Sequence, residues 1–206
     1  MKTIKLLFVI TFFQFSFINI CAMDAGQENC ALDFNDIESV KKVINEMFQI
    51  DQEMRTQFLQ DRHNPEVIEK MTTMDYGHTV KMKEIIAIHG WPIISKFGAE
   101  GDAQAWLLVQ HADRDLQFQE QCLGLLENLV ATKEINPNNY AYLYDRVALA
   151  QGNKQKYGTQ CFVSESSELF LRPHEGTMQD LDECRAQMGL MPIAAYLEQM
   201  KMVYEK

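Results

Sequence analysis

The chain has 206 residues, of which 47% are hydrophobic and 23% charged, a composition typical of a globular protein with one sizeable core. The formal net charge is −10 at pH 7, and no cluster of basic residues offsets it locally. Because affinity for nucleic acid depends largely on neutralising phosphates with Lys and Arg, we expect no nucleic-acid partner.

The first 22 residues have the features of a secretory signal peptide. Two lysines precede the apolar run Leu6–Ile20, and small residues follow it at Ala22 and Ala25, as expected for a positive region, an apolar core and a cleavage site. The alternative is an uncleaved membrane anchor, but the run is shorter than the roughly 20 apolar residues that span a bilayer. We therefore expect cleavage near Ala22 or Ala25, export to the periplasm or the medium, and no stable membrane insertion of the mature chain.

Four of the five cysteines remain after residues 1–22 are removed, namely Cys30, Cys122, Cys161 and Cys184. An even number of cysteines in an exported chain predicts at least one disulfide. We assign it to Cys161 and Cys184, because both lie in the C-terminal part. Cys122 lies in an amphipathic pattern and is equally well explained as a buried free thiol.

The N-terminal half is predicted to be helical. Apolar residues at helical spacing predict a helix over Asp36–Leu59. A second helix follows Asn64, begins at Pro65, where proline suits the first turn, and ends near His89 before Gly-Trp-Pro. Ile93–Gly101 is interpreted as a connector.

Three further helices are predicted in the middle of the chain, at about Asp102–Ala112, Leu116–Thr132 and Tyr140–Ala150. Within the first of them, Trp106–Val109 is apolar on every side, which predicts burial all round. The polar residues that follow directly must then find partners or destabilise the fold.

The C-terminal part combines a hairpin with two short helices. Cys161–Val163 and Leu169–Leu171 flank a polar segment and predict a β-hairpin, and helices are expected over Met178–Met188 and Ile193–Val203. The expected fold class is mainly α, a single-domain helical bundle with a small C-terminal β-hairpin. The chain divides into a signal peptide over 1–22, an N-terminal segment and helix over 23–64, and a helical domain over 65–206.

Four polar residues near the predicted core allow two interpretations. In the first, Arg146 pairs with Asp113 or Asp145, a carboxylate orients His111, and the group only holds helices together. In the second, His111 is a general acid or base, one aspartate orients it, and Arg146 stabilises negative charge. If the group is only structural, replacing His111 or Arg146 by Ala should cost about 3–5 kcal/mol, whereas in a ligand cleft the loss should stay within about 1 kcal/mol. We expect a split result, in which Arg146→Ala destabilises through its lost ion pair and His111→Ala is nearly neutral.

A metal site finds little support in the sequence. Asp75 and His78 are one helical turn apart and could share an ion with a third ligand such as His111. However, the H-E-x-x-H pattern of zinc hydrolases is absent, as are a P-loop and a dinucleotide-binding G-x-G-x-x-G. We therefore expect neither a metal nor a cofactor.

Four motifs occur in order along the chain, at His89–Pro92 (HGWP), Gln110–Asp113 (QHAD), Ala141–Arg146 (AYLYDR) and Gln155–Gln160 (QKYGTQ). In this order and spacing they resemble the bacterial domain of unknown function family 6624, and Arg185–Pro192 is similar to its closing segment. The resemblance covers about Asp75 to Leu197 and leaves the Asp36–Leu59 helix outside its most recognisable part. It brings no assigned activity, but it implies that the four motifs gather around one place.

We therefore predict one candidate site built from these motifs. Its catalytic residues are predicted to be His111, Asp113, Asp145 and Arg146. Its substrate contacts are predicted to be His89, Trp91, Gln110, Tyr157, Thr159 and Gln160. In an extended YGTQ strand, Tyr157 and Thr159 would share one face, and Gly158 would let a ligand or another backbone approach closely.

Three functions fit these predictions. The first is an exported hydrolase-like enzyme that acts on a small or extended polar substrate. The second is a non-catalytic module that binds a ligand or a partner through the same polar residues. The third is a structural protein in which these residues form a buried, mutually satisfied network.

Overall fold

The computed structural model describes residues 36–164 and 168–204. Seven α-helices and one two-stranded antiparallel sheet make up this part of the chain, which confirms the mainly α fold with a small C-terminal hairpin. The predicted signal peptide, its cleavage sites and Cys30 lie outside the described residues. Among the helices that are described, none is both long and apolar enough to cross a bilayer.

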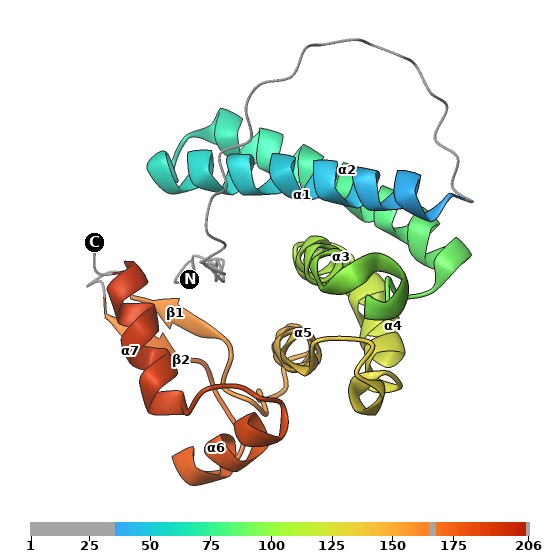
Figure 1. Cartoon of the computed structure of the whole chain (residues 1–206). Coiled ribbons are helices and arrows are strands. Elements are labelled where there is room, and N and C mark those ends of the chain that lie inside the picture. The colour runs from blue at the N-terminus through green and yellow to red at the C-terminus, as the bar shows by residue number, and fades with distance from the viewer. Residues whose placement is uncertain (1–35, 165–167, 205–206) are drawn as a thin grey trace.

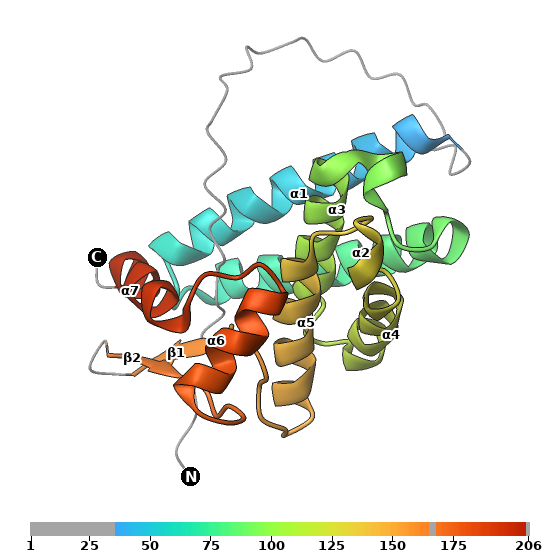
Figure 2. The same cartoon turned by 60° about the horizontal axis from the view of Figure 1, so that its bottom comes forward.

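Helices α1 (Ile37–Gln60) and α2 (Pro65–His89) form a long pair along one side of the molecule (Figure 1, Figure 2). The side chain of Asp36 caps α1 by accepting a hydrogen bond from the N–H of Ser39. Asn64 caps α2 directly before the proline of its first turn. Both predicted helices are therefore confirmed, and the second begins at the predicted proline.

Helix α3 (Ile94–Gln110) begins and ends earlier than predicted. Its first turn lies in the segment expected to be a connector, and Gly98 interrupts the helix with a φ of 76°, which glycine adopts without steric cost. The helix ends at Gln110, so His111 is its C-cap and not part of a further turn. Trp106–Val109 is buried as predicted, because α1 and α2 pack against α3 on one side and later helices cover the other.

Helices α4 (Leu116–Glu127) and α5 (Pro137–Ala150) cover the second side of α3 (Figure 1). The single helix predicted to reach Thr132 is divided, since α4 ends at Glu127 and a separate 3₁₀ turn, η1 (Val130–Thr132), follows. Helix α5 begins at Pro137 and not at Tyr140, because Asn136 caps it immediately before the proline.

Strands β1 (Cys161–Val163) and β2 (Leu169–Leu171) form the predicted hairpin, in a register that pairs the first residue of β1 with the last of β2. Helices α6 (Met178–Gln187) and α7 (Ile193–Tyr204) follow it. Helix α7 packs against β2 and α6, so the C-terminal elements form a compact group beside α5 (Figure 1, Figure 2).

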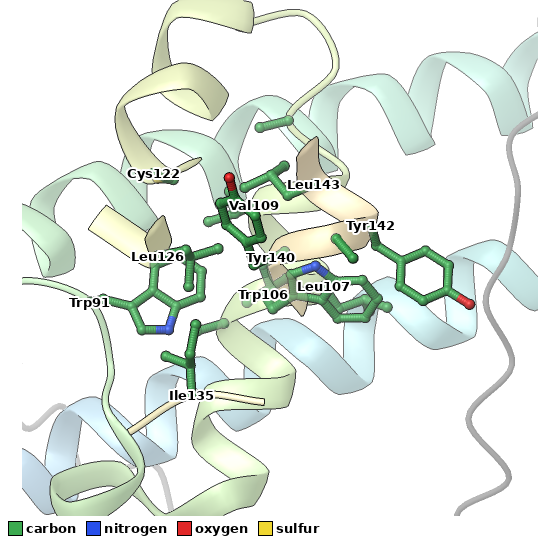
Figure 3. Close-up of a cluster of buried hydrophobic side chains, with 14 of the residues drawn as sticks. Trp91, Trp106, Leu107, Val109, Cys122, Leu126, Ile135, Tyr140, Tyr142 and Leu143 are labelled. Atoms are coloured by element: carbon green, nitrogen blue, oxygen red, sulfur yellow. The ribbon is translucent and has the colours of Figure 1, made fainter. Parts of the chain in front are cut away.

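One hydrophobic core joins these elements. Its centre is rich in aromatic side chains, and the ring of Trp106 on α3 packs edge-on against Tyr142 on α5, with 5.7 Å between centroids (Figure 3). Val40 and Ile44 on α1 belong to the same core. Helix α1 is therefore an integral part of the helical bundle.

The three cysteines in the described part of the chain are free. The predicted Cys161–Cys184 disulfide is therefore wrong. Strand β1 buries Cys161 in the core, whereas Cys184 lies on α6 and is half-buried, so a shared position late in the sequence did not bring the two sulfurs together. Cys122 fits the alternative of a buried free thiol, and burial raises the pKa of Cys122 and of Cys161 to about 12.

Candidate active site at the carboxyl end of helix α3

The buried face of α1 carries a pair of opposite charges. Its residues follow one another at intervals of three or four and are Val40, Ile44, Met47, Asp51 and Arg55. The side chains of Asp51 and Arg55 are 0% and 3% exposed. Because a buried charge is tolerated only when it is paired and hydrogen-bonded, this face of α1 needs polar partners from its neighbours.

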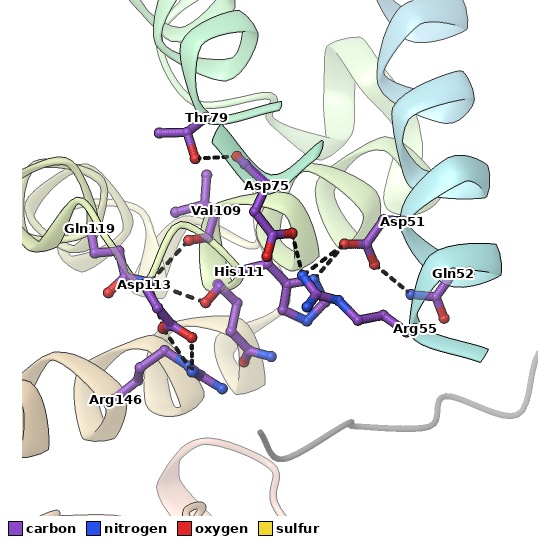
Figure 4. A network of polar contacts seen from close by, with 11 residues as sticks. Asp51, Gln52, Arg55, Asp75, Thr79, Val109, His111, Asp113, Gln119 and Arg146 are labelled. Carbon is purple, nitrogen blue, oxygen red and sulfur yellow. Dashed lines mark hydrogen bonds and ion pairs between the residues drawn. The ribbon is translucent and has the colours of Figure 1, made fainter. Parts of the chain in front are cut away.

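His111 is one of these partners. Its Nδ1 lies 2.8 Å from Oδ1 of Asp51, and the second carboxylate oxygen accepts a hydrogen bond from the amide of Gln52 at 2.9 Å (Figure 4). The sequence offered Asp113 or Asp145 as the residue that orients His111. The structure gives this position to Asp51, which lies 60 residues earlier in the chain.

Arg55 connects Asp51 to Asp75 of α2. Its Nη2 donates to Oδ1 of Asp51 at 3.2 Å and also to Oδ1 of Asp75 (Figure 4). One guanidinium thus pairs with two carboxylates and ties α1 to α2 beside the imidazole of His111.

The two carboxylates have pKa values shifted in opposite directions. Burial alone would raise the pKa of Asp51, but the charge and hydrogen bond of His111, followed by the charge of Arg55, lower it to about 2. For Asp75, burial dominates and raises the pKa to about 6, although the charge of Arg55 opposes it. Asp75 has fewer donors and faces the negative charge of Asp51. At neutral pH Asp51 is therefore firmly ionised, while Asp75 titrates close to neutrality.

His78 borders the same network, one turn beyond Asp75 on α2. Burial lowers the pKa of His78, and the charge of Asp51 opposes this shift. The arrangement of Asp75, His78 and His111 around one ion is not formed, because the carboxylate of Asp75 is paired with Arg55. Within the described residues, no three or more His, Cys, Asp or Glu side chains are grouped so that they could hold a metal ion.

A second ion pair lies next to His111. Nη1 of Arg146, on α5, donates to both oxygens of Asp113 at 2.8 and 3.0 Å (Figure 4). The amide of Gln119 donates to the backbone carbonyls of Val109 and Gln110 at 3.2 and 3.1 Å and so fixes the turn that follows α3. The predicted pairing of Arg146 with Asp113 is therefore present, and it links the QHAD turn to α5.

The network is partly exposed to solvent. The side chains of His111, Arg146, Asp75 and Asp113 are 6%, 11%, 16% and 21% exposed. Nε2 of His111 has no hydrogen-bond partner among the described residues. It is also not among the fully buried atoms that lack a partner, so this atom meets solvent. Two hollows, on α2 and between α4 and α5, are not lined by His111 or Arg146.

Asp145, the neighbour of Arg146 on α5, has a different environment. It is fully buried, and its carboxylate accepts hydrogen bonds from the backbone N–H groups of Lys156, Tyr157 and Thr159 at 2.7 to 3.0 Å and from the hydroxyl of Thr159 at 2.8 Å. Burial raises the pKa of Asp145, and these hydrogen bonds oppose the shift. Both oxygens are therefore used to hold the YGTQ loop, and neither is left to orient His111.

The YGTQ segment is a tightly held loop and not the strand that the sequence suggested. The amide of Gln155 donates to the carbonyls of Gln160 and Arg172, and its oxygen accepts from the N–H of Gln160 at 2.8 Å. Gly158 has a φ of 64°, and a Cβ at this position would lie 3.1 to 3.2 Å from Ile193 and Leu181. The close approach at Gly158 is thus made by side chains of α6 and α7.

The HGWP motif lies near the opposite end of α3. The indole N–H of Trp91 donates to Asp102 at 2.9 Å, and the same carboxylate accepts from Asn136 and Asn139. His89 packs edge-on against Phe97. Since Asp102 precedes Gln110 by eight residues in a helix, about 12 Å separate the two groups along the axis.

The predicted site residues thus fall into three groups. Gln110, His111, Asp113 and Arg146 lie together at the carboxyl end of α3, where they meet Asp51, Arg55 and Asp75. Tyr157, Thr159 and Gln160 lie with Asp145 on the other flank of α5, and Thr159 accepts a hydrogen bond from Gln160 at 3.2 Å. His89 and Trp91 belong to the Asp102 group.

A family model described as a family of unknown function (DUF6624) matches residues 38–206. The chain belongs to this family. No curated protein and no solved structure matches the chain. The matched region begins in α1, so Asp51 and Arg55 lie inside the family domain together with the QHAD turn. The helix that the motif resemblance had left outside is therefore part of that domain.

Asp51 and Arg55 were missed although the sequence contains a signal for them. Val40, Ile44 and Met47 form an apolar stripe along α1, and Asp51 and Arg55 occupy the next two positions of that stripe. A pair of opposite charges, four residues apart on the apolar stripe of a helix, indicates a buried ion pair. Asp75 has no comparable signal, because its role depends on how α2 packs against α1.

Proposed function

We propose that the chain is an exported enzyme of the hydrolase type, in which His111 is the general acid or base and Asp51 orients it. The observation that carries the proposal is the environment of the imidazole, whose Nδ1 lies 2.8 Å from a buried carboxylate while Nε2 meets solvent. Because a carboxylate can only accept, the proton of a neutral imidazole must be on Nδ1, which leaves the lone pair of Nε2 facing outward.

Such an arrangement supports proton transfer. Nε2 takes a proton from a water molecule or a hydroxyl group, and the ionised Asp51 stabilises the imidazolium that forms. A positioned general base typically contributes about 10²- to 10⁴-fold to a rate. Asp75, with a pKa of about 6, is a second group that can exchange a proton near neutral pH.

Arg146 can stabilise negative charge on a substrate only partly. Its Nη1 is engaged by Asp113, so the pair as a whole is neutral. Acidic groups also outnumber basic ones in the chain. We therefore expect a polar, uncharged substrate and no nucleic acid. The apolar run after two N-terminal lysines supports export to the periplasm or the medium.

The second candidate is a binding module without catalysis. It is favoured by one specific observation, namely that both amide atoms of Gln110 are buried and have no hydrogen-bond partner among the described residues. Such atoms can be satisfied by a ligand whether or not chemistry follows.

The test is turnover of a panel of chromogenic esters, amides, glycosides and phosphoesters by the full chain and by His111→Gln and Asp51→Asn. We expect turnover of one class, at least 100-fold slower in His111→Gln and reduced in Asp51→Asn. His63→Gln is the matched control, because His63 is exposed in the turn after α1 and should leave the rate unchanged. Equal turnover by His111→Gln, or no turnover of any class by the wild-type protein, would reject the enzyme in favour of the binding module.

A further inference from the structure

Helices α3 and α5 form a seam beside His111. Trp106 of α3 packs against Tyr142 of α5, and one turn further along α5 Arg146 pairs with Asp113, which lies in the turn that follows α3. Gln110 is one helical turn beyond Trp106 and is therefore on the same face of α3. It lies between these two contacts and is 1% exposed.

The seam contains four buried polar atoms that have no hydrogen-bond partner among the described residues. They are Nε1 of Trp106, Oε1 and Nε2 of Gln110, and Nε of Arg146. An unpaired buried donor or acceptor costs about 1–3 kcal/mol, so several in one place need an explanation. Gln155, which is equally buried, has a partner for both amide atoms.

The unpaired atoms define what would satisfy them. Trp106, Gln110 and Arg146 all offer N–H groups, while Oε1 of Gln110 is an acceptor. A phosphate or carboxylate ligand can accept these hydrogen bonds but leaves Oε1 of Gln110 unpaired. The charge of Arg146 is moreover already neutralised by Asp113, so nothing in the seam favours an anion.

One residue of an extended peptide meets both requirements, because in an extended backbone its N–H and its C=O point to the same side. The carboxamide of Gln110 can donate to that C=O and accept from that N–H, and the carbonyl oxygen has a second lone pair for Arg146 or Trp106. We propose that the α3/α5 seam binds the main chain of an extended peptide segment of the substrate. This inference rests on the proposed function, because His111 follows Gln110 directly and a peptide held in the seam lies beside the acid or base.

The experiment uses side-chain N–H signals of the full chain, observed by ¹H–¹⁵N NMR. The chain has two tryptophans, and Trp91 is an internal control because its indole N–H already donates to Asp102. The probe is N-acetylglycine N′-methylamide, which contains one residue with both its N–H and its C=O. The matched comparison is the same compound with a methyl group on the glycine nitrogen, which keeps both carbonyls and lacks that N–H. We expect the probe to shift the signals of Trp106 and Gln110 saturably, with Trp91 unchanged and the N-methylated compound binding at least tenfold more weakly.

Two variants complete the test. Gln110→Met, which removes both amide atoms at similar volume, should abolish the shift of Trp106, and Gln110→Glu, which keeps the shape, should weaken it at least tenfold. Equal binding of the N-methylated compound, or a Trp106 signal that does not respond, overturns the proposal and assigns the unpaired atoms to internal water. His111→Gln should still bind the probe with unchanged affinity, so loss of turnover and loss of peptide binding are separate results.

Discussion

Asp145 and Arg146 are neighbours on α5, yet the polar groups around them differ in how completely they are hydrogen-bonded. On the Asp145 side, the YGTQ loop places three backbone N–H groups and one hydroxyl on a single buried carboxylate. On the Arg146 side, one ion pair is partly exposed, and buried polar atoms of Trp106, Gln110 and Arg146 itself have no partner within residues 36–164 and 168–204.

The difference separates structural residues from candidates for function. A fully satisfied buried network fixes one conformation and leaves nothing to offer a ligand. A region with unpaired buried atoms, shifted carboxylate pKa values and an imidazole that meets solvent has unused hydrogen-bonding capacity. Tyr157 and Thr159 therefore belong to the architecture of the molecule, whereas Gln110 and His111 remain the proposed functional residues.

The largest expected effect is that of Asp145→Asn. The new amide would direct an NH₂ group at donors of the YGTQ loop, and charge-assisted hydrogen bonds worth about 1.5–3 kcal/mol each would be lost. We expect the free energy of unfolding to fall by about 3–5 kcal/mol in denaturant melts. A loss below about 1 kcal/mol would show that the loop does not depend on this carboxylate.

Asp75→Asn should change how stability depends on pH. The folded pKa of Asp75 is raised from 3.8 to about 6, so its contribution to stability is fully present below about pH 4 and is lost as pH rises through 6. Relative to wild type, the variant should gain stability from pH 4 to pH 8, by up to about 3 kcal/mol. Asp51 acts in a separate window, since its lowered pKa contributes stability above pH 3.8 that is lost as pH falls through about 2.

The measurement is a pair of urea melts at each pH, and the quantity compared is the difference between the two proteins. This difference cancels the titration of groups that both share, such as His78. A difference that does not change between pH 4 and pH 8 would mean that the carboxyl of Asp75 has an ordinary pKa.

His111→Ala and Arg146→Ala should differ in the order opposite to the one expected from the sequence. Loss of His111 leaves Asp51 fully buried with Arg55 and Gln52 as its remaining partners, for an expected cost of about 2–3 kcal/mol. Loss of Arg146 leaves Asp113, which is 21% exposed and can be hydrated, so the cost should stay near 1 kcal/mol. A heavier loss for Arg146→Ala than for His111→Ala in the same melts would contradict the network as described.

The smallest effect is expected at Gln110. Gln110→Met removes two unpaired buried atoms at nearly constant volume, so the free energy of unfolding should rise by about 1 kcal/mol or stay unchanged. Gln155→Met is the matched control, because it removes an amide whose atoms are all paired and should destabilise clearly. If Gln110→Met destabilises as much as Gln155→Met, the amide of Gln110 has partners in solution and the seam has no unused capacity.

The sequence predicted most reliably the helices whose ends are marked by local start or stop residues. Asp36, Asn64 with Pro65, and Gly98 each act within a few residues of a helix end, and the start at Asn64 and Pro65 was interpreted correctly. The start of α3 was missed because Gly98, which has a positive φ inside the helix, looks in the sequence like a residue of a connecting loop. The fully apolar Trp106–Val109 stretch gave the position of the core directly.

The site was harder to predict because its partners are distant in the chain. Spacing indicated that His111 needs a carboxylate, and two nearby candidates were chosen, whereas the structure provides Asp51 from α1. The pairing of Arg146 with Asp113 was among the options because both are charged residues beside helices that were expected to be buried. Which polar residue of one helix meets which residue of another depends on packing angle and register, and neither is encoded in the spacing within a single segment.

Whether His111 can act as a base depends on which of its ring nitrogens carries the proton. Long-range ¹H–¹⁵N correlation of the imidazole distinguishes the two neutral tautomers, and the spectrum of His111→Gln identifies the signal. We predict that the proton is on Nδ1, facing Asp51, with an unprotonated Nε2, and that Asp51→Asn removes this preference. A proton on Nε2 in the neutral wild-type protein would contradict it, because His111 would then have no lone pair directed outward to act as a base.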